Sequence, residues 1–228
     1  MRLAAALIGL LLLGPTAGRA EPATDAEAVR HHVQAGQWKK AHRALDRWLL
    51  DTVKAGGAMD GQDLVRAVRY RAVIEAGKGH SESSRWWWHA GLNLQAEGAE
   101  AWLRYLPEAA AAELGGMTVR PLEPKKAPPK FRQGPERLEG DPIEEGSKKI
   151  FSPASRRFRG AVELQIKFGR KNEFKEPLLI AVEGVPTVCV YAALDYADST
   201  RFPATWRAGR EVAGYRVVFS GWGANPGR

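Results

Sequence analysis

The sequence predicts an α+β protein, with N-terminal all-α repeat-like helical hairpins, then a proline-rich linker, then a small β-β-α-β domain. Apolar residues recur at three- and four-residue spacing through residues 25–115, as they do in amphipathic helices. Six prolines and many charges fall within residues 118–150, which predicts an extended linker. Apolar and polar residues then alternate over residues 160–169, which predicts a half-buried strand.

The first twenty residues have the pattern of a cleaved secretory signal. Arg2 precedes an apolar run over residues 3–13, and the small residues Gly18 and Ala20 stand before the expected cleavage point. Spanning a bilayer takes about 20 apolar residues, so a retained membrane anchor is the less favoured alternative. We therefore expect a periplasmic or secreted mature chain that does not span the membrane. Its expected segments are 1–20 (signal), 21–117 (helices), 118–149 (linker) and 150–228 (sheet domain).

Five helices are expected between residues 25 and 114. Glycines mark the ends of the first three, Asp60 begins the third, and the fourth covers residues 81–96. The fifth is expected to run unbroken over residues 99–114 and to cap the stack, because two hairpins alone bury little apolar surface.

Two of the helix breaks share a pattern, one beginning at Gly36 and the other at Gly79. After the first, Trp38, Ala41 and Leu45 follow the Gly-x-aromatic-x-x-Ala order of the second helix in a tetratricopeptide repeat. The segment from about residue 25 to residue 115 therefore resembles tetratricopeptide-like hairpins, and the resemblance implies a surface that binds another protein.

Three tryptophans occur in a row on the fourth expected helix. Consecutive helical residues point in three directions, so Trp86, Trp87 and Trp88 cannot form one stacking platform. We expect two of them in the core of the hairpin and one exposed. The alternative, a surface that stacks bases or holds a cation, is less favoured.

The C-terminal region is expected to have the order strand, strand, helix, strand. Val162, Leu164, Ile166 and Phe168 lie on one face of the first expected strand. The second strand is expected over residues 174–183. A helix over 187–199, a loop over 201–209 and a last strand over 211–222 follow.

This order and its residues resemble the TonB C-terminal domain over about residues 150–222. The matching residues are Gly160 and Val162 before and in the first strand, Ala192, Ala193 and Leu194 in the helix, Arg201, Phe202, Pro203, Ala204 and Gly209 in the loop, and Tyr215, Val217 and Phe219 in the last strand. The resemblance implies a small sheet whose last strand accepts an extended segment of an outer-membrane receptor.

A three-stranded sheet has two edges, and an exposed edge recruits a further strand. Combined with the resemblance, this predicts a partner-binding edge at Ala213, Tyr215, Val217 and Phe219. The expected function is a non-enzymatic periplasmic adaptor. It would bind an envelope protein at this edge and another partner through the hairpins. The sequence leaves open the partners, the oligomeric state and any part in energy transduction.

The charge suggests an alternative ligand. The chain carries +8, and Arg2 and Arg19 lie in the signal, where no acid stands, so the mature chain carries +6 (8 − 2). An exported basic protein meets little nucleic acid, so we expect no nucleic-acid partner. The alternative function is binding of anionic wall or lipopolysaccharide polymer through Arg156, Arg157 and Arg159, together with Lys125, Lys126 and Lys130.

No spacing in the sequence indicates catalysis. There is no nucleophile elbow, phosphate loop or zinc motif, so we expect no enzyme activity, no cofactor and no metal. A cluster of His32, Gln37 and His42 is the one conceivable metal site. Cys189 is the single cysteine and stands between two valines, which predicts a buried thiol without a disulfide.

Overall fold

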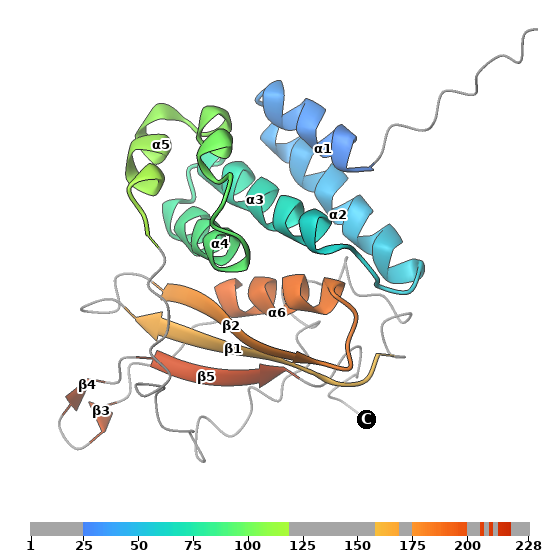
Figure 1. Ribbon diagram of the computed structural model, residues 1–228. Coiled ribbons are helices and arrows are strands. Elements are labelled where there is room, and N and C mark those ends of the chain that lie inside the picture. The colour runs from blue at the N-terminus through green and yellow to red at the C-terminus, as the bar shows by residue number, and fades with distance from the viewer. Residues whose placement is uncertain are drawn as a thin grey trace, which may run out of the picture.

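The computed structural model describes residues 25–118, 158–168, 175–199, 206–207, 210–211 and 214–219. The fold is α+β. Helices α1 to α5 form one layer, helix α6 lies beneath them, and a three-stranded antiparallel sheet lies beneath α6 (Figure 1). Among the described residues, the helices are all too short or too polar to cross a membrane.

Two helical hairpins build the upper layer. Helices α1 (Asp25–Gln34) and α2 (Trp38–Lys54) form the first, and α3 (Gly61–Gly77) and α4 (Ser81–Leu94) form the second. Each hairpin turns at a glycine with positive φ, +63° at Gly36 and +80° at Gly79, a conformation that glycine adopts without strain. The residue after each glycine donates its amide to a carbonyl five positions earlier, at 2.9 Å in both turns. The two glycine breaks seen in the sequence are therefore the same structural turn.

The expected fifth helix is wrong as a single element. A 3₁₀ helix η1 (Glu100–Tyr105) comes first, and the short helix α5 (Glu108–Gly115) follows it. Pro107 stands between them with an extended ψ of 145° and caps α5. The physical reason is that proline is tolerated at the start of a helix but interrupts a continuous one.

The sheet has the strand order β2-β1-β5, with all pairs antiparallel. Strand β1 (Ala161–Phe168) is central, β2 (Lys175–Glu183) pairs on one side and β5 (Gly214–Phe219) on the other. The register between β1 and β2 shifts after Glu163, which places a bulge in β2. At the start of β1, a Cβ on Gly160 would lie 1.9 Å from a carbonyl oxygen of β2, so only glycine fits there.

The end of the chain differs from the expected single strand over residues 211–222. Strand β5 covers only residues 214–219, and two short strands precede it. Strands β3 (Trp206–Arg207) and β4 (Arg210–Glu211) pair with each other in a separate two-stranded sheet. Most of the segment expected to be loop over 201–209 lies outside the described residues.

Helix α6 (Val188–Ser199) contributes to one core shared by the hairpins and the sheet. Its residues Val188 to Asp195 are all buried, because the sheet covers one side and helices α2, α3 and α4 approach the other. Cys189 is buried and free as expected, and burial raises the pKa of its thiol to about 12.

The prediction for the tryptophan run is wrong in one respect. Trp86, Trp87 and Trp88 are all buried, so none is exposed. The sequence pattern treats α4 as a helix with one apolar side, whereas α4 is covered by α3, by α6 and by strand β2.

Candidate partner-binding site

The two edges of the sheet are differently protected. The outer edge of β2 lies against α4, where the Asn93 side-chain amide donates to the Pro177 carbonyl at 2.6 Å. His89 on the same helix lies 3.5 Å from the Glu176 carboxylate. Pro177 also has no amide to offer to an added strand. Helix α4 and this proline therefore protect the β2 edge from strand addition near its N-terminal end, whereas Val182 near its other end is exposed.

The β5 edge carries no such cover within the part of the chain that the structure describes. Strand β5 pairs with β1 from Gly214 to Phe219, and none of the described strands pairs with its other side. In an antiparallel strand, main-chain groups point alternately to the two sides. Alternate amides and carbonyls of β5 consequently face away from β1, as an added strand requires.

The residues expected at this edge are placed as follows. Tyr215 and Val217 lie in β5, where they pair with Ile166 and Leu164, whereas Ala213 lies outside the described residues. Phe219 also lies in β5, but the whole residue is only 1% exposed, so it belongs to the core and is not available to a partner.

Phe219 belongs to the core because its ring meets Tyr196 of α6 edge to face, with centroids 5.8 Å apart. Its neighbour Val218 is 49% exposed and is one of two large apolar residues exposed on the described surface. Sequence reasoning missed Val218, although its position in the alternating strand, one residue from the buried Phe219, is the signal that identifies it.

The expected anionic-ligand patch is described at one residue only. Arg159 is exposed, and its Nη1 donates to the Phe158 carbonyl at 2.9 Å. Arg156 and Arg157, like Lys125, Lys126 and Lys130, lie outside the described residues.

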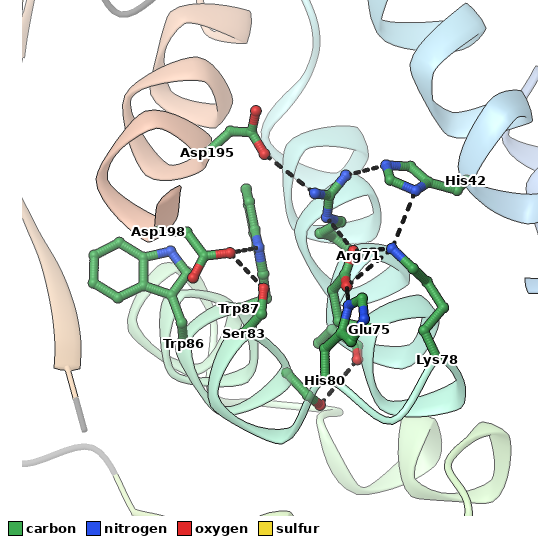
Figure 2. A network of polar contacts seen from close by, with 12 residues as sticks. His42, Arg71, Glu75, Lys78, His80, Ser83, Trp86, Trp87, Asp195 and Asp198 are labelled. Carbon is green, nitrogen blue, oxygen red and sulfur yellow. Dashed lines mark hydrogen bonds and ion pairs between the residues drawn. The ribbon is translucent and has the colours of Figure 1, made fainter. Parts of the chain in front are cut away.

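Helix α6 is fixed to α4 by three hydrogen bonds across the two parts of the fold. The Trp86 indole donates to the Leu194 carbonyl at 3.1 Å, and the Trp87 indole donates to Asp198 Oδ2 at 3.0 Å. The Ser83 hydroxyl donates to the same carboxylate oxygen (Figure 2). These bonds satisfy polar groups that burial would otherwise leave without a partner, so they favour a single arrangement of sheet and hairpins.

A buried charged cluster lies beside these bonds and is centred on Arg71 of α3. Its Nε lies 2.9 Å from Glu75 Oε1 and its Nη2 lies 3.4 Å from Asp195 Oδ1 of α6 (Figure 2). Nη1 contacts the His42 ring of α2, and the guanidinium lies 5.6 Å from the Trp87 ring centroid. One cation thus joins α2, α3, α4 and α6.

Burial and charge act in opposite directions on this cluster. Burial raises the pKa of Asp195 to about 6, against the attraction of Arg71. Burial would also raise the pKa of Glu75, but Arg71, His80 and Lys78 together lower it below its ordinary value. Glu75 also lies 3.1 Å from Lys78 and 2.7 Å from His80. For Asp195, Arg71 is the only cation in an ion pair among the described residues.

His32 contacts Gln37 at 3.1 Å, but the described residues contain no grouping of histidine, cysteine and carboxylates suited to a metal ion. Comparison with protein-family models, with curated proteins and with solved structures finds no match to the chain.

Proposed function

We propose that this protein is a non-enzymatic adaptor of the cell envelope that binds an extended segment of an envelope protein by strand addition to β5. The observation that carries the proposal is the asymmetry of the sheet: α4 and Pro177 cover the β2 edge near its N-terminal end, while none of the described strands pairs with the outer side of β5. The secretory signal pattern supports a periplasmic location.

Two further features support the same function. The strand order β2-β1-β5 with α6 on one face is compatible with the resemblance to the TonB C-terminal domain, in which the last strand accepts a receptor segment. The repeated glycine turns are compatible with tetratricopeptide-like hairpins, which we propose bind a second partner. The shared core holds both surfaces in one body, as an adaptor requires.

The test is affinity capture from an envelope extract with residues 21–228 as bait. Arg216→Pro and Val217→Pro form a matched pair, because adjacent amides of β5 point to opposite sides of the strand. In one of the two variants the lost amide faces β1, so that variant should have a lower free energy of unfolding. In the other variant the lost amide lies on the open edge, so that variant should stay folded and should not capture the partner. Urea unfolding shows which variant is which.

Two outcomes would contradict the proposal. One is equal capture by the wild type and by the proline variant that stays folded. The other is recovery of acidic polymer alone, released as salt rises above physiological ionic strength, which would favour the alternative function of binding anionic envelope polymer.

A further inference from the structure

A pocket is lined by residues of helices α1 and α3 and of the 3₁₀ helix η1. Its volume is about 340 Å³. Sites for small molecules usually have volumes of about 300–1,000 Å³, so this one is at the small end of the range. A ligand with one ring and a short substituent would fit within it.

One wall of the pocket is aromatic and rigidly held. Tyr70 and Trp102 meet edge to face with ring centroids 4.8 Å apart, and Trp102 meets Tyr105 in the same way at 5.8 Å. Arg69 lies 5.9 Å from the Trp102 ring centroid and donates to the carbonyls of residues 95 and 97. The aromatic wall is therefore fixed before any ligand enters.

The remaining lining is strongly cationic. Arg30, Arg66 and Arg104 line the pocket, and Glu27 is its single acidic residue. Glu27 pairs with Arg30 at 3.2 Å, and Arg66 pairs at 3.1 Å with Asp63, which does not line the pocket. Arg104 makes no ion pair with a described residue and donates instead to the Tyr105 hydroxyl at 2.9 Å. The lining residues themselves carry a net charge of +2, from three arginines and one glutamate, and Asp63 offsets part of it at Arg66.

Two of these arginines act on the pKa of the Tyr70 phenol. Burial and the neighbouring Tyr105 raise its pKa, while Arg30 and Arg66 act to lower it. Arg30 of α1, Arg66 of α3 and Arg104 of η1 come from three different elements and line the same pocket as the aromatic wall. A planar guanidinium matches a carboxylate through two parallel hydrogen bonds.

We propose that this pocket binds a small aromatic carboxylic acid, with its ring against Tyr70 and Trp102 and its carboxylate at Arg66 and Arg104. This inference rests on the proposed adaptor function in one respect only: it adds a small-molecule ligand for the helical hairpins of that adaptor. The lining comes from α1, α3 and η1 and includes nothing from β5. Failure of one proposal therefore leaves the other standing.

The experiment is isothermal titration calorimetry of residues 21–228 with phenylacetate. Phenylacetamide has the same ring without the charge, and acetate has the charge without the ring. We expect saturable binding of one phenylacetate per chain, with much weaker binding of either control. Arg66→Gln and Arg104→Gln should each weaken binding about tenfold or more, as expected for loss of a charge-assisted hydrogen bond.

Two matched variants test the charge argument. Arg47→Gln changes an exposed arginine of α2 that does not line the pocket, and it should leave the affinity within about twofold. Glu27→Gln removes the only carboxylate of the lining, so it should strengthen binding severalfold, which loss of structure would not do. Both residues are exposed, so neither substitution should affect folding.

Four results would overturn the inference. The first is absence of phenylacetate binding to the wild type. The second is equal binding of phenylacetamide or acetate, and the third is an equal loss in Arg47→Gln. Tighter binding of a tetraglutamate peptide than of phenylacetate, with the same response to Arg66→Gln, would also contradict it, because the pocket would then be part of a surface for acidic chains.

Discussion

Arg71 and Asp195 are expected to respond very differently to substitution, although they form one buried ion pair. Arg71 also pairs with Glu75, so it keeps a carboxylate when Asp195 is replaced. Asp195 has no second cation in an ion pair among the described residues. Arg71→Met should therefore leave a buried carboxylate without a counter-charge, whereas Asp195→Asn should not leave an unpaired cation.

The magnitudes follow from burial. Removing one member of a buried ion pair typically costs about 3–5 kcal/mol, which is the loss in unfolding free energy expected for Arg71→Met at pH 7.5. Burial raises the pKa of Asp195 from 3.8 to about 6. Folding therefore favours its protonated form, and this contribution to stability is complete below pH 3.8 and is lost as pH rises through 6. At about 1.4 kcal/mol per pH unit, the loss is about 3 kcal/mol.

The assay is urea unfolding followed by circular dichroism at pH 4 and pH 7.5. The unfolding free energy of Asp195→Asn, taken relative to that of the wild type, should rise by about 3 kcal/mol from pH 4 to pH 7.5, because the variant lacks the group that titrates. Arg71→Met should lose more unfolding free energy at pH 7.5 than at pH 4, where Asp195 is protonated. The reasoning fails if Asp195→Asn destabilises the protein at pH 7.5 as much as Arg71→Met does, or if neither difference changes with pH.

Three further predictions concern the junction of the hairpins and the sheet. Gly57→Ala places a Cβ 2.7 Å from a ring atom at a φ of +81°, so it should lower the unfolding free energy by about 2 kcal/mol, whereas Gly61→Ala meets nothing within 4 Å and should not. Urea titration of both variants checks this. Trp86→Phe removes a buried hydrogen bond, whereas the Trp88 indole has no hydrogen-bond partner among the described residues. Trp86→Phe should therefore lower the unfolding free energy by about 1–3 kcal/mol more than Trp88→Phe does. Equal losses in urea unfolding would count against this prediction. The Cys189 thiol, with its pKa raised to about 12, should resist a disulfide reagent at pH 8 until urea unfolds the chain, and rapid labelling of the folded protein would contradict its burial.

Local structure was largely predictable from the sequence because it depends on local patterns. The apolar spacing around Trp38 and Leu45 predicted α2, and alternation over residues 160–169 predicted β1 within a residue at each end. Gly36 and Gly79 were identified as turns because few other residues tolerate positive φ. The break at Pro107 could have been predicted from the same local chemistry.

The contacts between distant segments were not predictable from local patterns. Trp86 and Trp87 pair with α6, which is more than 100 residues later in the chain, and their burial therefore cannot be read from the α4 sequence alone. The pocket is similar, because Arg30, Arg66 and Arg104 lie on three elements whose approach depends on packing. The closure of the β2 edge by Asn93 likewise depends on how the hairpins sit on the sheet.

The most direct test of the central claim is site-specific photo-crosslinking in the intact envelope. A photoreactive residue would replace Val218 on β5 or Val182 on β2, which are 49% and 42% exposed and lie on opposite edge strands. Strand addition at β5 predicts a crosslink from position 218 to one extended segment of an envelope protein, and none of comparable yield from position 182. Equal crosslinking from both positions, or a crosslink from position 182 alone, would contradict the claim that β5 is the open edge.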